Sequence, residues 1–372
     1  MSDLFLRSLH LVNFKNYPEA SLDLSDKINV FVGPNGAGKT NLLDAVYYLS
    51  MTKSYFNSID VQNIRYDEGF YLIEGEYQRG EEKERIHLGL KKGHKKVLKR
   101  NKKEYERLSE HIGRYPLVMI SPYDRDLIME GSEIRRRFMD GVISQSDRLY
   151  LDDLLQYNKA LAQRNALLKY FAANRTFDPT QLEIYDEVLC ERGDRIHEAR
   201  RKFMQEMEPI LLSYYAKIAG DEEPLSIRYR STVEGSSMRN VLRENLDKDR
   251  VLQFTGQGIH KDDLKFLLFD HPLKKTGSQG QQKSFLIALK LAQFDFMKSQ
   301  TGTKPLLLLD DIFDKLDEHR VRALVELVNE HHFGQIFISD THPERTAALT
   351  RQINEETRIF DVQKGGTVRE AI

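Results

Sequence analysis

Three short runs of almost purely apolar residues stand out along the chain: Ile28–Val32, Leu306–Leu309 and Ile336–Ile338. Strands that are buried on both faces of a parallel sheet have such near-continuous apolar sequences. Each run is followed closely by glycines, carboxylates or a histidine. Because ligands bind at the carboxyl ends of parallel strands, the pattern predicts a functional site where these strands end.

Other segments alternate between apolar and polar positions, as half-buried strands do. Phe5–Phe14 alternates well enough to predict an edge strand, and Ala20–Leu24 predicts a second strand after a turn. The other segments predicted to be strands are Phe70–Tyr77, Glu84–Leu90, Lys95–Arg100, Leu225–Tyr229 and Lys265–Phe269.

The middle of the chain has the apolar spacing of helices. Asp147–Phe171 carries a broad leucine stripe, and Thr180–Ile218 continues as helix, with Pro209 predicted to kink or break it. We predict an all-helical insertion here, far too short to form a long coiled-coil arm. Further helices are predicted to begin at Asn41 and to cover Ser284–Met297.

Composition limits the classes of partner and compartment. The chain has 56 Lys plus Arg against 57 Asp plus Glu, so a polyanion site must be a local patch. Its one cysteine, Cys190, excludes an internal disulfide framework and fits a reducing cytosol. No stretch approaches the roughly 20 apolar residues that span a bilayer, and the N-terminus does not resemble a leader. We expect a soluble, cytoplasmic protein without membrane contact.

The first apolar strand runs into a phosphate-binding loop with the pattern G-x-x-x-x-G-K-T, and a helix follows. Its glycines allow consecutive N–H groups to point at phosphate oxygens, and the helix N-terminus favours the same anion. Lys39 is expected to contact the β- and γ-phosphates, and the Thr40 hydroxyl to bind Mg²⁺. The residues predicted to bind the nucleotide are Gly33, Pro34, Asn35, Gly36, Ala37, Gly38, Lys39 and Thr40.

The other two apolar strands end in candidate catalytic groups. Asp310 is expected beside Lys39 and Thr40, where it would hold Mg²⁺ through a water. Asp311 would lie one step further on, near the attacking water. His342, at the end of a neighbouring strand, is placed for the γ-phosphate. Two acids after a leucine run also suit a turn and a helix cap, but the phosphate loop upstream favours catalysis.

A second anion-binding loop is predicted at residues 277–283, where the sequence Gly-Ser-Gln-Gly-Gln-Gln-Lys opens a helix. Its N–H groups are suited to holding a phosphate. Ser278, Gly280 and Gln281 are the candidate contacts. This sequence is weak evidence for an anion site by itself, and the carboxylates Asp310 and Asp311 downstream strengthen it.

Two basic runs are candidates for DNA contact, since phosphates attract clustered Lys and Arg. A solvated edge that resists aggregation is an equally good interpretation of the first run, and a solvated helix face is the better one for at least part of the second. The candidate DNA contacts are Lys95, Lys96, Lys99, Arg100, Arg135 and Arg136.

Taken in chain order, these motifs resemble those of an ABC-type ATPase head, and more closely those of the RecF family of bacterial recombinational repair proteins. The resemblance covers nearly the whole chain, and jointly its motifs are highly specific. The matching motifs are Phe14–Tyr17, Ser121-Pro122-x-Asp124, Arg135–Phe138 with Asp140, Gly258-x-His260-x-Asp262-Asp263-Leu264, Ser278 to Lys283, Leu309-Asp310-Asp311 and Leu316-Asp317.

The resemblance implies an α/β fold: an ABC-type P-loop ATPase head with a mostly helical second lobe and no long coiled coil. A chain of 372 residues is expected to form two lobes. We place the ATPase lobe at residues 1–115 and 223–372 and the helical lobe at 116–222. The family further implies an ATP-dependent homodimer on DNA gaps or junctions, slow DNA-stimulated ATP hydrolysis, and cooperation with RecR and RecO to load recombinase. Roles in replication restart and the SOS response follow from the same resemblance.

Two departures from common ABC ATPases qualify this comparison. Asp311 stands where most of them have Glu, so hydrolysis is expected to be slow, and Ser121–Asp124 offers no glutamine for the Q-loop. A transporter subunit would normally show Leu-Ser-Gly-Gly-Gln and lack the helical insertion, and a small-molecule kinase would need no Ser278 motif. A structural DNA clamp that binds ATP with little hydrolysis remains the main alternative.

Overall fold

The computed structural model describes residues 4–220, 223–312, 326, 332–344 and 356–371. They form two compact units, residues 1–124 with 286–372, and residues 125–285. The predicted motif Leu316-Asp317 lies outside the described residues.

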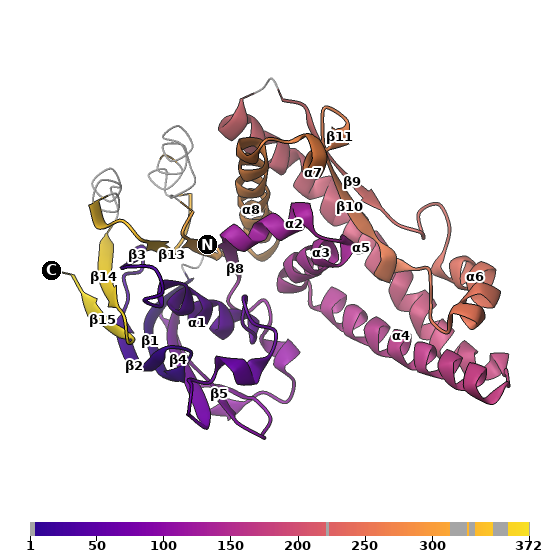
Figure 1. The fold of residues 1–372 in the computed structure, drawn as a ribbon, viewed down its shortest axis with the longest axis horizontal. Helices are drawn as coiled ribbons and strands as arrows, with labels where there is room; N and C mark the ends of the chain where they lie inside the picture. The colour runs from indigo at the N-terminus through magenta and orange to yellow at the C-terminus, as the bar shows by residue number, and fades with distance from the viewer. Residues whose placement is uncertain (1–3, 221–222, 313–325, 327–331, 345–355, 372) are drawn as a thin grey trace. The chain divides into compact units, whose positions relative to one another are not determined.

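The first unit contains the parallel sheet that the three apolar runs predict (Figure 1). All neighbours in it are parallel except the last pair, in which β15 runs antiparallel to β14. Because β13 lies between β3 and β12, the ends of all three predicted strands meet at one edge. In spatial order the strands are β15 (Thr367–Glu370), β14 (Thr357–Gln363), β3 (Ile28–Val32), β13 (Ile336–Asp340), β12 (Leu306–Asp310) and β8 (Leu117–Ile120).

A second sheet in the same unit is antiparallel, and helix α1 (Lys39–Met51) packs against strands of both sheets. Apolar side chains from the two sheets and from α1 form one continuous core. The predicted edge position of the first strand is wrong, because β1 lies between β2 and β4. The strands in order are β2 (Tyr17–Asp23), β1 (Leu4–Phe14), β4 (Phe70–Arg79), β5 (Glu82–Lys91), β6 (Val97–Arg100) and β7 (Lys103–Glu104).

Short helices and one long helix complete the first unit. Helix α8 (Gln279–Thr301) begins in the second unit and continues into the first, where its apolar residues are buried. The 3₁₀ helices are η1 (Asp60–Asn63), η2 (Leu108–His111) and η3 (Pro122–Arg125), the last of which spans the boundary between the units.

The second unit is mainly helical, and its two long helices α4 and α5 run side by side (Figure 1). Asp147 caps the start of α4 by accepting hydrogen bonds from two backbone N–H groups. Pro209 does not break α5, which continues to Ala219. The helices are α2 (Asp126–Met129), α3 (Ser132–Ser146), α4 (Arg148–Asn174), α5 (Pro179–Ala219), α6 (Met238–Leu252), η4 (Ile259–Lys261) and α7 (Leu273–Thr276).

This unit also contains a small sheet in the order β11 (His271–Pro272), β10 (Asp263–Leu268), β9 (Leu225–Arg230). All described elements between Asp126 and Ala219 are helices, as predicted, but the compact unit also includes this sheet. Because β9 and α6 pack on α5, and β10 on α3, the compact unit extends to Phe285 rather than ending at residue 222. Strand β8, which falls in the segment predicted as the helical lobe, belongs instead to the parallel sheet.

Candidate nucleotide-binding site

The loop after β3 has the backbone that its glycines predict. Gly36 and Gly38 have φ values of 78° and 116°, in a region that side chains disfavour. At Gly33 an added Cβ would lie 2.1 Å from the carbonyl oxygen of Val362 on β14, so only glycine allows β14 to approach. Residues 34–36 at the tip of the loop are exposed. The loop is thus open to a ligand on one side and packed tightly on the other.

Lys39 begins α1 and folds back over its own loop. Its ammonium donates to the carbonyl oxygens of Gly33 at 2.7 Å and Pro34 at 3.1 Å. Burial lowers the pKa of Lys39, and the nearby carboxylates of Asp311, Asp310 and Asp340 oppose this shift. Lys39, which is predicted to bind phosphate, therefore lies near three carboxylates at the ends of two strands.

Thr40 and Asp310 meet as the sequence predicts. The Thr40 hydroxyl donates to Oδ1 of Asp310 at 2.8 Å, and the hydroxyl of Ser339 donates to the same oxygen at 2.8 Å. Burial raises the pKa of Asp310, while the hydrogen bonds from Ser339 and Thr40 act in the opposite direction. Sequence reasoning missed Ser339, although its position one residue before the end of an apolar strand was a usable signal.

Asp311 has a strained backbone, with φ at 48°. Its N–H donates to the Ser339 hydroxyl at 2.9 Å, which orients the residue. Within the described part of the chain, its buried Oδ1 has no hydrogen-bond partner. Buried carboxylate oxygens are normally hydrogen-bonded, so this atom marks a position where a polar ligand or water belongs.

His342 follows β13, as predicted, but its side chain is 59% exposed. Its ring Nδ1 lies 2.9 Å from the Thr341 hydroxyl, and its backbone N–H donates to Oδ1 of Asp340 at 3.0 Å. Asp340 is buried and its carbonyl accepts from the N–H of Gly33 at 3.3 Å. Asp340 thus ties the end of β13 to the start of the phosphate loop, a role that sequence reasoning missed.

Asn16 and Tyr17 hold the phosphate loop from outside. The Asn16 amide donates to the Ala37 carbonyl at 2.8 Å, and the Tyr17 hydroxyl donates to the Gly38 carbonyl at 2.9 Å. An added Cβ on Gly38 would lie 2.4 Å from the Asn16 amide nitrogen, so this contact also requires glycine. The sequence marked these residues as part of a motif but did not predict their contact with the loop.

The residues 278–281 form a capping box at the start of α8. The Ser278 hydroxyl accepts from the Gln281 N–H at 3.2 Å, and the Gln281 side-chain oxygen accepts from the Ser278 N–H at 2.8 Å. This pairing explains the Ser-x-x-Gln spacing structurally. It leaves the hydroxyl hydrogen of Ser278 as a donor, so the predicted phosphate contact is chemically compatible with the cap. Gly280 follows in the first turn of the helix.

The first basic run contains both exposed and internally paired side chains. Lys95 is exposed and Lys99 is half-buried. Lys96, by contrast, donates to Asp60 at 2.7 Å and to the Thr52 carbonyl at 2.6 Å, and its side chain is only 11% exposed. Lys96 is therefore committed to the fold in this conformation, which counts against its predicted DNA contact. Arg100 lies 3.3 Å from Glu84 and is partly committed in the same way.

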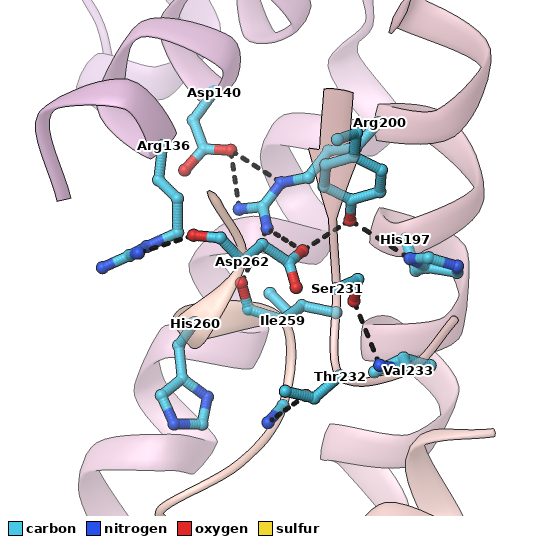
Figure 2. Close-up of polar contacts among 12 residues, drawn as sticks. Arg136, Asp140, His197, Arg200, Ser231, Thr232, Val233, Ile259, His260 and Asp262 are labelled. Carbon is cyan, nitrogen blue, oxygen red and sulfur yellow. Dashed lines mark hydrogen bonds and ion pairs between the residues drawn. The ribbon is translucent and has the colours of Figure 1, made fainter. Parts of the chain in front are cut away.

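The second basic run lies in the polar core of the second unit. Arg135 is buried, pairs with Asp263 at 2.7 Å and donates to two backbone carbonyls. Arg136 donates to the Asp262 carbonyl at 2.7 Å (Figure 2). These contacts make Arg135 a structural residue and count against its predicted DNA contact, because releasing it would break the ion pair and both bonds to backbone carbonyls, although Asp263 would keep a second partner in Lys265 at 2.7 Å.

Arg200, which the sequence did not single out, is the centre of this polar core. Figure 2 shows its guanidinium between Asp140 and Asp262, at 2.8 Å and 2.7 Å respectively, with a further bond to the Ile259 carbonyl. It thereby joins two of the motifs that carried the family resemblance. Their role in this unit is to hold α3, α5 and the η4 loop together.

The nucleotide site offers oxygen ligands suited to Mg²⁺. Thr40 and Asp310 present a hydroxyl and a carboxylate oxygen in direct contact, and Mg²⁺ in such sites takes one or two protein ligands together with phosphates and waters. Among the described residues, no cluster of three or more His, Cys, Asp or Glu side chains is arranged to hold a metal. The donor set therefore fits an ion that a nucleotide helps to bind.

Comparisons with known proteins agree with this site. A family model described as the AAA ATPase domain matches residues 5–342. The DNA replication and repair protein RecF of Flavobacterium johnsoniae is 56% identical over 359 residues, which cover 96% of this chain and 100% of that protein. The protein of the same name from Phocaeicola vulgatus is 49% identical and covers 97% of both chains.

This chain belongs to the RecF family.

Solved structures of RecF share its fold over the whole chain. Those described as the recombination mediator protein RecF-ATP and RecF-ATPrS in the RecFOR pathway superpose with TM-scores of 0.90 and 0.88, each at 29% identity. They cover 100% of this chain and 98% and 99% of theirs. An Smc head domain from Pyrococcus furiosus, at 15% identity and a TM-score of 0.58, shares the fold alone. The predicted ABC-type head is confirmed. No described helix is long and apolar enough to cross a membrane.

Proposed function

We propose that this RecF-family protein is an ATP-dependent DNA-binding protein of bacterial recombinational repair and replication restart. The observation that carries the proposal is the contact of Thr40 with Asp310 beside Lys39, at the edge where three parallel strands end. Such a combination of loop N–H groups, ammonium, hydroxyl and carboxylate suits a phosphorylated ligand that binds together with a cation. The 56% identity to a DNA replication and repair protein supports the biological setting.

ATP would occupy the phosphate loop with its β- and γ-phosphates at Lys39. The ammonium would exchange the carbonyls of Gly33 and Pro34 for phosphate oxygens, which are stronger, charge-assisted acceptors. Thr40 and Asp310 would hold Mg²⁺, which supplies positive charge to the phosphates. Asp310 must be ionised for this; burial raises its pKa, and the hydrogen bonds from Ser339 and Thr40 oppose that rise.

Hydrolysis would be slow and would depend on Asp311. The side-chain oxygen of Asp311 that has no partner among the described residues would orient the attacking water, and the exposed His342, which follows the neighbouring strand β13, would approach the γ-phosphate. Because aspartate is one methylene shorter than the glutamate of common ABC ATPases, it holds water less closely. We expect weak turnover that DNA increases.

A second copy of the chain would complete the site through Ser278. Its hydroxyl hydrogen and the N-terminal turn of α8 would contact the γ-phosphate held by the Lys39 of the other copy. ATP but not ADP would then favour the homodimer, since a ligand shifts an equilibrium only by its differential affinity. Hydrolysis would release the dimer and its DNA.

The proposed partners are DNA, at gaps or junctions, and the proteins RecR and RecO, with which this chain would promote recombinase loading and the SOS response in the cytoplasm. The descriptions of two structural relatives place those proteins in the RecFOR pathway, which supports this assignment. Lys95 and Lys99 are the remaining candidates for DNA contact in the first basic run.

ATP turnover measured with and without DNA tests the proposal. We expect slow release of phosphate that rises with added DNA and is lost in Asp311→Asn, while that variant still binds ATP. The main alternative is a structural clamp, favoured by the strained backbone of Asp311. Turnover that is negligible in the wild type and unchanged in Asp311→Asn, with ATP-dependent DNA binding intact, would establish the clamp instead.

A further inference from the structure

An exposed surface at one end of the antiparallel sheet combines aromatic and basic side chains. Tyr66 is 87% exposed and Phe70 is 45% exposed. Phe70 pairs in register with Lys91, and the N–H of Lys92 donates to the Gly69 carbonyl at 2.8 Å. Gly69 and Phe70, at the end of the loop that contains Tyr66, therefore lie against the turn that follows β5. We name residues 60–70 the linking segment and residues 91–95 the basic turn.

The charge and chemistry of this surface suit a nucleic acid. Lys91, Lys92 and Lys95 of the basic turn are all exposed, and residues 91–103 contain no Asp or Glu. Of the two acids near Tyr66, Glu68 pairs with Arg65 at 3.5 Å. Clustered lysines bind phosphates, and exposed aromatic rings stack on unpaired bases. The combination points to DNA with a single-stranded portion.

Lys96 fixes the basic turn to the linking segment. Its bond of 2.7 Å to Asp60 joins the first residue of η1 to the residue that follows the basic turn. The Lys96 side chain is largely buried and that of Asp60 is half-buried, with exposures of 11% and 35%. Separating the two would leave the largely buried ammonium of Lys96 without its carboxylate partner, so the pair resists separation. A ligand held by the basic turn therefore also acts on the linking segment.

The linking segment in turn contacts residues 13–17, which we name the support turn. The N–H of Lys15 donates to the Asn63 carbonyl, and the N–H of Arg65 donates to the Asn13 carbonyl, both at 2.8 Å. The support turn holds Asn13 and Lys15 at φ values of 51° and 53°, an unfavourable backbone that these contacts help to maintain.

The opposite side of the support turn holds the phosphate loop. Asn16 and Tyr17 donate to the Ala37 and Gly38 carbonyls, and Lys15 donates to Asp44 of α1 at 2.5 Å. Asp44 is fully buried, so the position of Lys15 is closely determined. One five-residue turn is thus bonded both to the linking segment and to the loop that would bind ATP.

We propose that the support turn couples DNA bound on the surface of Tyr66, Phe70 and the basic turn to ATP bound at the phosphate loop. Asn16 and Tyr17 are the positioning residues, acting on ATP through the loop carbonyls rather than by touching it. The inference rests on the proposed function and adds where DNA binds and how it alters ATP affinity. Coupling between two ligands is reciprocal, so each must raise the affinity for the other by the same factor.

The test measures this factor directly. A fluorescent oligonucleotide, single-stranded or duplex, is titrated with protein in the absence and presence of saturating, non-hydrolysable ATP analogue with Mg²⁺. The ratio of the two dissociation constants is the coupling factor, which we expect to be at least roughly fivefold in the wild type. Asn16→Ala and the milder Tyr17→Phe are expected to bring it close to one. Because it is a ratio, a general loss of DNA affinity does not alter it.

Ser21→Ala is the matched control. Ser21 lies in β2, on the strand pair that the support turn connects, and its hydroxyl makes an exposed bond of 2.8 Å to His10 away from the loop. The coupling factor of Ser21→Ala is expected to equal that of the wild type. Repeating the titrations in Ser278→Arg removes the contribution of dimerisation, and the dependence on Asn16 should persist there.

The outcomes separate the inference from the proposed function. Wild-type protein that binds no DNA overturns both. Wild-type protein that binds ATP analogue and DNA without coupling, or an Asn16→Ala variant that keeps the wild-type factor, overturns the inference alone. Tyr66→Ala should weaken binding of single-stranded oligonucleotide more than binding of duplex. An equal effect on both forms overturns the assignment of base stacking.

Discussion

The hydroxyl of Thr40 donates a hydrogen bond of 2.8 Å to Oδ1 of Asp310, joining residues 270 positions apart in the chain. The contact arises because β3 and β12 lie on either side of β13 with all three strands parallel. Any ion that binds Thr40 must therefore also approach the carboxylate of Asp310.

Thr40→Val should remove the dependence of nucleotide affinity on Mg²⁺. Valine keeps the shape of threonine but has no oxygen for the ion, and it also removes one of the donors to Asp310. Calorimetric titration of a non-hydrolysable ATP analogue with and without Mg²⁺ measures the effect. Thr40→Ser, which keeps the hydroxyl, is the control. Full Mg²⁺ enhancement in Thr40→Val would contradict the predicted metal ligand.

Lys39→Met should nearly abolish ATP binding while leaving the fold intact. The side chain supplies a charge-assisted bond to phosphate, and its loss is expected to cost roughly 2–3 kcal/mol, or about 30- to 150-fold in affinity. Fluorescent nucleotide titration gives the affinity, and a melting curve shows whether the variant is folded. Unchanged ATP affinity in a folded variant would contradict the assignment of the phosphate loop.

Lys95→Gln and Lys99→Gln should flatten the salt dependence of DNA binding. Each lost phosphate contact lowers the slope of log affinity against log salt by roughly 0.9 for duplex. Lys96→Gln is the contrasting variant: it should lower the melting temperature, because the ion pair with Asp60 and the bond to the Thr52 carbonyl are lost, and leave the slope unchanged. If the slopes of Lys95→Gln and Lys99→Gln match the wild type, this strand is a solvated edge.

Ser278→Arg and Asp311→Asn should have opposite effects on the ATP-dependent dimer. Arginine at residue 278 removes the hydroxyl donor and adds bulk, so this variant should bind ATP and remain monomeric. Asp311→Asn should bind ATP, fail to hydrolyse it and accumulate as dimer. Light scattering with ATP measures both. A Ser278→Arg protein that dimerises like the wild type would falsify the arrangement in which the second copy completes the site.

Stability should fall as the pH drops below about 6.5, because of the buried His111 and the half-buried His260. Burial lowers the pKa of His111 and of His260 from 6.5 to about 4. Both are thus neutral in the folded protein at pH values where the unfolded chain binds protons. Their stabilisation is complete above the unfolded pKa and is lost as the pH falls from 6.5 towards 4, by up to about 3 kcal/mol each.

His260→Gln tests this pH dependence in the second unit. The ring bonds the Tyr157 hydroxyl at 2.9 Å and the Thr255 carbonyl at 3.0 Å, which fits a neutral imidazole that accepts from the first and donates to the second. Urea unfolding at about pH 7.5 and about pH 5 should show a smaller loss of stability for His260→Gln than for the wild type. Equal losses would exclude His260 as a contributor.

The nucleotide site was predictable from sequence because its parts are local. A glycine loop between an apolar strand and a helix has few alternative conformations, so Gly36, Gly38 and Lys39 could be assigned before the fold was known. The carboxylates could be placed because strands of a parallel sheet present their carboxyl ends at one edge. Helix and strand types were predictable for the same reason, since apolar spacing of about 3.6 or 2 residues is a local property.

Contacts between distant segments were decided only by the tertiary structure. Charge alone could not distinguish the exposed Lys95 from Lys96. The partner of Lys96, Asp60, is separated from it in the chain by strands β4 and β5. Arg135 likewise looked available in sequence but pairs with Asp263. The second unit extends beyond residue 222 because β9 and α6 pack on α5, and local periodicity carries no information about such packing. The sequence by itself determined the nucleotide-binding chemistry of this protein. Tertiary packing decided which charged residues pair inside the fold and which are exposed to a ligand.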